Sequence, residues 1–224
     1  IADVIVRPRS IDELARLRAW LHERELAHVV FGATSNLLFA DEGLRAIGVQ
    51  IGGTFAPLSI VGSEMTAGSG VWVPGLARRA MQAGLTGIEH ICGIPGTLGG
   101  LICMNGGSQR KGIGEVVVSV TSVNAQGAVR HRSREECAFA YRRSIFQSND
   151  EVIAEAMLRL EPATDRGAMR REMLEILSSR RRKFPQKQPN CGSVFVSNPA
   201  MYKEYGPPGA IIEQCGLKGM KIGD

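Results

Sequence analysis

The sequence lacks the features on which several classes of protein depend. No apolar run approaches the roughly 18 residues that cross a membrane, and no signal peptide opens the chain. The five cysteines are an odd number and include no C-x-x-C pair, and the four histidines show no metal-ligand spacing. We therefore expect a cytoplasmic protein without a metal site, a disulfide framework or a membrane contact.

The charge balance is basic but not extreme. The 224 residues carry a formal net charge of +5, and much of the excess lies in segments 130–135 and 178–187. Such clusters suit nucleic acid or an anionic small molecule. Aromatic residues, which would stack on bases, make up only 5% of the chain, so we prefer a small molecule to nucleic acid.

The beginning of the chain predicts a strand, a helix and a second strand. Residues 4–8 and 28–31 have strand composition, and the helix between them begins after Ser10, with Glu13 completing a capping box. A strand–helix–strand unit tends to place its two strands in a parallel pair.

The middle of the chain predicts short strands around one helix. Strands are expected within 46–67, and a helix over 74–83 should end at Gly84, which can adopt the left-handed cap conformation. A hairpin is expected within 115–133, because two strand-like runs flank a turn that contains glycine.

The last part of the chain predicts helices around a boundary. Ser133 and Glu136 form a second capping-box pattern, which predicts a short helix. Further elements are expected at these positions: a strand over 151–160, a boundary at 161–165, an amphipathic helix from Met169 to about Arg182, and a short helix near 209–215.

The segment 93–108, GIPGTLGGLICMNGGS, is rich in glycine and has no charge. Such a segment is often only a set of tight turns, but its exposed amides can also approach a phosphate. No Lys–Ser/Thr pair follows, which excludes a P-loop, and no G-x-G-x-x-G spacing supports a dinucleotide fingerprint. A second glycine-bearing loop at 32–38 leaves the strand at 28–31, so two loops about 60 positions apart could clamp one ligand with two phosphates.

Four motifs give the chain its resemblance to a known family. They are FGATSNLLFAD (31–41), GLTGIEHICGIPGTLGGLICMNGG (84–107), FAYRRSIF (139–146) and CGSVFVSNP (191–199). In this order they are similar to the motifs of bacterial UDP-N-acetylenolpyruvoylglucosamine reductases, and the resemblance extends over essentially the whole chain.

The resemblance implies an α+β protein with a two-part FAD-binding domain of the vanillyl-alcohol-oxidase, or PCMH, type. This domain would cover 1–163, with subdomains of about 1–52 and 53–163, and a C-terminally truncated substrate-binding domain would cover 164–224. The implied cofactor-binding residues lie in the glycine loops and two further positions: Gly32, Ala33, Thr34, Ser35, Asn36, Leu37, Gly93, Ile94, Pro95, Gly96, Thr97, Gly99, Gly100, Asn105, Gly107, Tyr141 and Arg180.

The family's activity implies the chemistry. NADPH would reduce FAD, and the reduced flavin would reduce UDP-N-acetylglucosamine enolpyruvate to UDP-N-acetylmuramate in peptidoglycan precursor synthesis. Arg142 would stabilise the enolate-like charge and Ser193 would donate the proton, while Lys183 and Asn198 would bind substrate. We expect a monomer whose partners are small molecules.

The sequence also departs from the family pattern. The CGSVFVSNP box is one residue longer than is common in the family and lacks its lysine, and the family's catalytic glutamate follows the segment at which this sequence stops. We therefore expect impaired turnover with flavin binding retained. Another FAD oxidoreductase of the same fold, a non-catalytic flavin-binding module and a basic nucleic-acid binder are the alternatives.

Overall fold

The computed structural model describes residues 2–184, 195 and 198–222. Clustering of the backbone divides the chain into two compact units, 1–183 and 184–224. The helix that follows the predicted boundary at 161–165 belongs to the first unit, since its buried methionine and isoleucine side chains join that unit's core. The division of the chain into domains at 163/164 stays a prediction.

The first unit begins with a parallel sheet. Its strands, in spatial order, are β1 (Ala2–Val6), β3 (Leu44–Gln50) and β2 (His28–Phe31). Strands β1 and β2 each pair in parallel with β3, which lies between them. The expected direct pairing of the first two strands is therefore wrong, because a third strand that is distant in sequence inserts between them.

Helix α1 (Ile11–Glu23) connects β1 and β2 and begins as predicted. The Ser10 hydroxyl accepts a hydrogen bond of 3.1 Å from the Glu13 amide. The Glu13 carboxylate accepts from the amide of Arg9, one residue before the position that a capping box requires. The cap is thus present in a shifted form.

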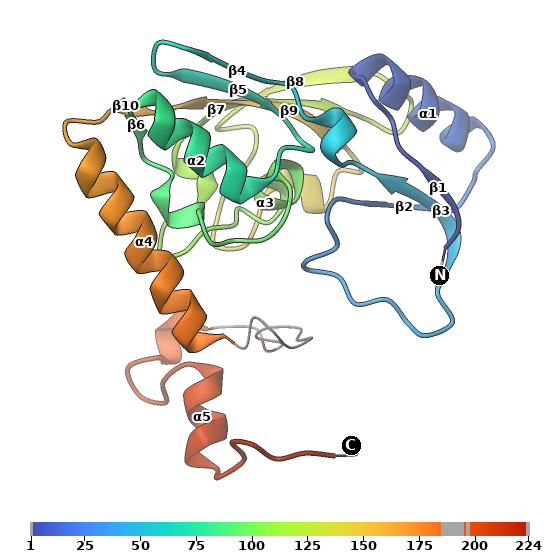
Figure 1. The fold of residues 1–224 in the computed structure, drawn as a ribbon. Helices are drawn as coiled ribbons and strands as arrows, with labels where there is room; N and C mark the ends of the chain where they lie inside the picture. The colour runs from blue at the N-terminus through green and yellow to red at the C-terminus, as the bar shows by residue number, and fades with distance from the viewer. Residues whose placement is uncertain (1, 185–194, 196–197, 223–224) are drawn as a thin grey trace. The chain divides into compact units, whose positions relative to one another are not determined.

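A larger antiparallel sheet forms the centre of the unit (Figure 1). Its strands, in spatial order, are β4 (Leu58–Val61), β5 (Glu64–Gly68), β9 (Val152–Arg159), β7 (Val117–Val123) and β8 (Val129–Ser133). Strands β7 and β8 form the predicted hairpin. A small two-stranded sheet pairs β6 (Leu85–Thr86) with β10 (Glu161–Pro162).

Three helices pack with the five-stranded sheet around the main hydrophobic core. They are α2 (Val73–Ala83), α3 (Leu98–Cys103) and α4 (Arg166–Lys183). Helix α2 ends at Gly84 with φ 73°, the left-handed cap that the sequence predicts. Fully buried members of this core include Met65, Leu76, Leu98 and Leu158.

A second core joins the two sheets. Leu14 and Leu21 of α1 pack with Val49 of the parallel sheet and Val123 of the large one. Arg18, only 1% exposed, strengthens this junction with hydrogen bonds and ion pairs to four partners: the Asp150 carboxylate (3.0 Å), the carbonyls of Asp150 (2.7 Å) and Asn124 (3.4 Å), and the ring of His28.

The remaining elements are short. The 3-10 turns of the first unit are η1 (Gly53–Phe55), η2 (Glu89–Ile91), η3 (Ile113–Glu115) and η4 (Ile145–Gln147). In the second unit, η5 (Pro199–Met201) and α5 (Pro208–Gln214) are described, and α5 agrees with the helix predicted near 209–215.

Candidate functional site

The two glycine-bearing loops lie against each other. The hydroxyl of Ser35 donates a hydrogen bond of 2.9 Å to the carbonyl of Pro95. A Cβ atom on Gly32 would lie 2.2 Å from Oγ1 of Thr97, so only a residue without a side chain fits there. The predicted convergence of the two loops is therefore present in the fold.

Backbone hydrogen bonds fix the second loop on the scaffold. The Val73 amide donates to the Gly96 carbonyl at 3.0 Å, and the Leu98 amide donates to the Val71 carbonyl at 2.9 Å. Gly96 has φ 138°, a conformation that L side chains rarely adopt. The loop is thus held by the start of α2 and by the start of α3.

The amides of both loops are available to a ligand. Among the residues that the structure describes, no carbonyl or side chain accepts a hydrogen bond from the amides of 33–36, nor from those of Gly96 and Thr97. Segment 33–36 is exposed, whereas Thr97 is buried. Backbone donors on two adjoining loops suit an anion such as a pyrophosphate. The geometry thus fits the phosphates of FAD.

One buried residue beside these loops was not predicted from the sequence. Ser69 lies under the start of α3, where its carbonyl accepts from the Gly99 amide at 2.8 Å. A Cβ on Gly99 would come within 2.9 Å of the Ser69 side chain. Within the described parts of the chain, the Ser69 hydroxyl has no hydrogen-bond partner, although it is buried. The flanking Gly68 and Gly70 are the sequence signal that could have drawn attention to it.

Arg180 of α4 reaches the beginning of the second loop. A Cβ on Gly93 would lie 2.4 Å from Cδ of Arg180. Its neighbours Arg181 and Arg182 are exposed, so Arg180 is the arginine of this run that packs on the loop. Burial lowers the pKa of the Arg180 guanidinium below its usual range, and the charge of the neighbouring Cys92 offsets only part of this shift.

Tyr141 and Arg142 occupy the two central positions of a tight turn. Ala140 and Arg143 exchange backbone hydrogen bonds, each 3.0 Å long, and Arg142 has φ 55°. The Arg142 guanidinium donates to the Gly107 carbonyl at 3.3 Å and lies 5.8 Å from the centre of the Tyr141 ring. The turn therefore lies against the end of the glycine-rich segment, as a shared site requires.

The side chains of Asn105 and Ser144 fasten this turn with further hydrogen bonds. The Asn105 side chain donates to the Ala140 carbonyl at 2.8 Å and accepts from the Gly114 amide at 2.9 Å. The buried Ser144 hydroxyl donates to the Cys103 carbonyl at 2.7 Å. Asn105, predicted as a flavin contact, thus has both its polar atoms engaged with the protein.

The other predicted site residues have varied positions. Leu37, Pro95 and Gly100 are exposed, and Ile94 is half-buried. Gly107 is buried, and a Cβ there would lie 1.9 Å from the Lys111 carbonyl oxygen, so this position excludes a side chain. Of the two substrate-binding candidates, Lys183 is the exposed last residue of α4, and Asn198 directly precedes η5, where its carboxamide oxygen accepts from the Ala200 amide at 3.2 Å. The predicted proton donor, Ser193, lies outside the described residues.

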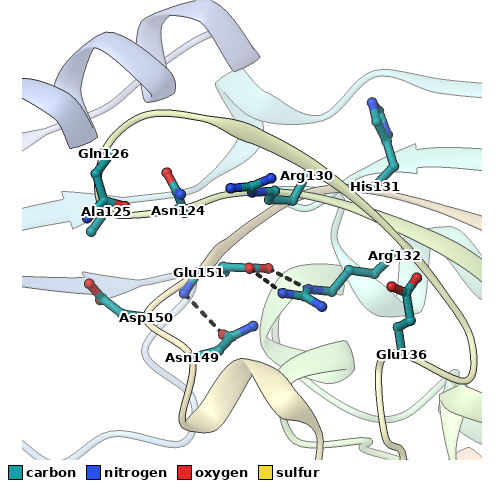
Figure 2. A pocket seen from close by; sticks show the side chains of 10 residues that line it. All are labelled: Asn124, Ala125, Gln126, Arg130, His131, Arg132, Glu136, Asn149, Asp150 and Glu151. Atoms are coloured by element: carbon teal, nitrogen blue, oxygen red, sulfur yellow. Dashed lines mark hydrogen bonds and ion pairs between the residues drawn. The ribbon is translucent and has the colours of Figure 1, made fainter.

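A hollow of about 580 Å³ lies elsewhere, beside the β7–β8 hairpin (Figure 2). Arg132 and Glu151 form a bidentate pair there, with N–O distances of 2.8 Å and 2.5 Å. These hydrogen bonds from Arg132 hold the pKa of Glu151 below its usual range. No predicted site residue lines the hollow, whose lining residues are Asn124, Ala125, Gln126, Arg130, His131, Arg132, Glu136, Asn149, Asp150 and Glu151.

No described helix is long and apolar enough to cross a membrane. In the same part of the chain, no group of three His, Cys, Asp or Glu side chains is placed to hold a metal ion.

Comparison with known proteins defines the class of the first unit. Residues 2–133 match the family of FAD binding domains. The fold is also similar to that of a cholesterol oxidase variant from Brevibacterium sterolicum, with a TM-score of 0.54 at 13% identity over 70% of this chain and 34% of the other. The protein is thus a mixed helix-and-sheet flavoprotein with an FAD-binding domain of the PCMH type.

Closer relatives identify the family. Residues 184–224 match the C-terminal domain of UDP-N-acetylenolpyruvoylglucosamine reductase. The chain is 43% identical to UDP-N-acetylenolpyruvoylglucosamine reductase 1 of Corynebacterium glutamicum, over 99% of this chain and 66% of that protein. It is 37% identical to reductase 2 of Symbiobacterium thermophilum, covering 70% of that protein. The chain belongs to the UDP-N-acetylenolpyruvoylglucosamine reductase family of FAD-dependent oxidoreductases.

A solved structure agrees with this assignment. The reductase from Thermus caldophilus aligns with 98% of this chain and 76% of its own, with a TM-score of 0.79 at 28% identity. This chain therefore spans about two thirds to three quarters of the length of these relatives.

Proposed function

We propose that the protein reduces UDP-N-acetylglucosamine enolpyruvate to UDP-N-acetylmuramate, with NADPH as the electron donor. The observation that carries this proposal is the meeting of three motif segments: the loop at 32–38, the glycine-rich segment and the Tyr141–Arg142 turn. The first two meet through Ser35 and Pro95, and the turn lies against the second. A flavin site and a cationic group beside it are what this reaction needs.

The chain's own residues would hold FAD from two sides. The amides of 33–36 and those of Gly96 and Thr97 would donate to its pyrophosphate, and Arg180 would add positive charge next to Gly93. When bound, FAD supplies hydride transfer from NADPH to the alkene of the substrate. The protein then has to orient the substrate, stabilise negative charge and deliver a proton.

Arg142 would stabilise the negative charge that develops next to the substrate carboxylate. A guanidinium stays charged at any working pH and presents two parallel donors, which match a carboxylate. The left-handed backbone at Arg142 fixes where the side chain leaves the turn. Donors fixed before the reaction stabilise charge more effectively than donors that must reorganise.

Proton delivery and substrate binding would involve residues of two segments. Ser193 would give its hydroxyl proton to the substrate carbanion, and Lys183 and Asn198 would contact the substrate. Tyr141, which is exposed beside Arg142, would pack near the flavin ring. These four roles extend the family's motifs to the matching positions of this chain.

The proposed setting follows from the proposed reaction. The substrates are small anionic molecules, the product is a precursor of peptidoglycan, and the enzyme would act in the cytoplasm as a monomer. It would thereby support cell-wall growth, cell shape and division.

Separate half-reactions test the proposal. Under anaerobic conditions, NADPH should bleach the flavin absorbance of the purified protein, and the enolpyruvyl substrate should restore it. Arg142→Ala should leave the first step intact and slow the second about 10²–10³-fold, because one preorganised charge stabiliser is lost. Reduced flavin that the enolpyruvyl substrate cannot reoxidise would show that the reaction is a different one.

A further inference from the structure

The turn that carries Arg142 has little support of its own. Two backbone hydrogen bonds close it, those between Ala140 and Arg143, and the Gln147 side chain donates one more, of 3.2 Å, to the Arg142 carbonyl. Both central side chains, Tyr141 and Arg142, are exposed, and the contact of Arg142 with Gly107 is long at 3.3 Å. A turn of this kind needs outside anchors to hold one orientation.

Asn105 provides such an anchor from the end of the glycine-rich segment. It is a non-glycine residue with φ 40°, a backbone conformation that asparagine tolerates better than most residues. Its carboxamide has one possible orientation, since the Gly114 amide can only donate and the Ala140 carbonyl can only accept. A Cβ on Gly112 would lie 2.6 Å from Oδ1, so the carboxamide is closely enclosed.

We propose that Asn105 is a positioning residue, which holds the Tyr141–Arg142 turn so that the Arg142 guanidinium points into the site. This inference rests on the role of Arg142 in the proposed function. The hydrogen bond from Nδ2 to the Ala140 carbonyl carries the effect, and the bond between Oδ1 and the Gly114 amide keeps the carboxamide in place. Ser144, whose hydroxyl binds the Cys103 carbonyl, anchors the other end of the turn.

The substitution Asn105→Asp separates the two bonds. Aspartate has the same shape and tolerates the same backbone conformation. It keeps an acceptor for the Gly114 amide but cannot donate to the Ala140 carbonyl. Asn124→Asp is the matched control, because Asn124 lies in the β7–β8 turn and its side-chain oxygen accepts from the Ala128 amide at 2.8 Å, a bond that aspartate keeps.

Hydrogen exchange measured by mass spectrometry tests the anchor without substrate or turnover. In Asn105→Asp, the peptide that contains residues 139–147 should exchange about three- to tenfold faster, which corresponds to the loss of one hydrogen bond. Asn105→Gly, which adopts the same φ and loses both bonds, should show the same increase. Asn124→Asp should leave this peptide unchanged. An unchanged peptide in both Asn105 variants would overturn the proposal.

Kinetics test the positioning of Arg142. Asn105→Asp should slow reoxidation of the reduced flavin by the enolpyruvyl substrate about tenfold, and by a larger factor than it slows the reduction of bound flavin by NADPH. The double variant with Arg142→Ala should be no slower than Arg142→Ala alone, since a positioning residue acts through the residue it positions. Two outcomes would refute the positioning of Arg142 by Asn105. One is that the rate losses of Asn105→Asp and Arg142→Ala add up in the double variant. The other is that Asn105→Asp exchanges faster but leaves the reoxidation of the flavin by substrate unchanged.

The two proposals fail in different ways. A wild-type protein whose reduced flavin ignores the enolpyruvyl substrate would overturn the proposed function, and the catalytic part of this inference with it. The exchange experiment would still decide whether Asn105 anchors the turn.

Discussion

The hydroxyl of Ser35 donates a hydrogen bond of 2.9 Å to the carbonyl of Pro95, across 60 positions of the chain. Ser35 belongs to the connection between β2 and β3, and Pro95 to the connection between η2 and α3. One hydrogen bond therefore joins the loop that follows β2 of the parallel sheet to the loop that precedes α3. The amides that suit a pyrophosphate lie on both sides of this junction.

Gly32→Ala should weaken FAD binding at least tenfold, because the new Cβ would meet Oγ1 of Thr97 at 2.2 Å and push the two loops apart. Titration of the protein with FAD, followed by flavin fluorescence, measures this loss. Gly75→Ala is the matched control, since a Cβ on this residue of α2 would lie 3.8 Å from Cδ1 of Trp72, an ordinary van der Waals contact. Equal FAD affinities in Gly32→Ala and Gly75→Ala would contradict an FAD-binding site formed by these two loops.

Glu151→Gln should lower the free energy of unfolding by about 2 kcal/mol, because it leaves Arg132 without a charged partner in a mostly buried pair. Arg132 holds the pKa of Glu151 low, so this stabilisation is present above the ordinary carboxylate pKa and is lost as pH falls. Urea unfolding at pH 7 and at pH 4 measures both effects. Glu64→Gln, in the exposed pair with Arg159, should cost less than about 1 kcal/mol.

His90 should make the protein less stable in mild acid. Burial, with the nearby charge of Lys111, lowers the pKa of this histidine, so the unfolded state binds its proton more tightly than the folded state. Stability should therefore fall as pH drops below about 6.5, by up to about 1.4 kcal/mol per pH unit for one proton. The free energy of unfolding of the wild type and of His90→Phe, measured between pH 7.5 and pH 5, checks this prediction. The wild type should lose more stability than His90→Phe as pH falls, and an equal loss in both proteins would contradict the role of His90.

Cys92 and Cys137 should resist alkylation in the native protein. Burial raises the pKa of each thiol to about 11, so at pH 8 only about one molecule in a thousand carries a given thiolate. Cys215 is exposed and should react with iodoacetamide within minutes. Mass spectrometry of tryptic peptides before and after unfolding distinguishes the sites. Rapid native labelling of Cys92 would mean that the core around α4 opens readily.

Local patterns predicted the elements of this fold well but not their arrangement. The Ser10 cap, the Gly84 cap and the β7–β8 hairpin depend on neighbouring residues, and each is present. The position of β3 between β1 and β2 depends on contacts distant in sequence, which periodicity does not encode. The buried Arg18 junction was not predicted for the same reason.

The Ser133–Glu136 pattern shows how a correct local signal can predict the wrong element. The Ser133 amide donates to the Glu136 carboxylate at 2.8 Å, and the Glu136 amide donates to the Ser133 hydroxyl at 3.3 Å. A turn follows instead of a helix, because Ala138 has φ 49° and cannot continue a right-handed helix. The predicted short helix is therefore wrong although its capping box forms.

The candidate site was predicted in part. Glycine content and spacing indicated two loops around one ligand, and the structure brings those loops together. The buried Ser69 hydroxyl and the bond from Asn105 to Ala140 could not be predicted, since each depends on a partner brought close by the fold. Which residues contact FAD and substrate stays a prediction.

The most direct test is a visible absorption spectrum of the purified wild-type protein beside Gly32→Ala. The account predicts a flavin spectrum for the wild type, with FAD released on denaturation, and a weak or absent spectrum for the variant. A colourless wild type that also fails to bind added FAD would contradict an FAD-binding site where the loops of Ser35 and Pro95 meet.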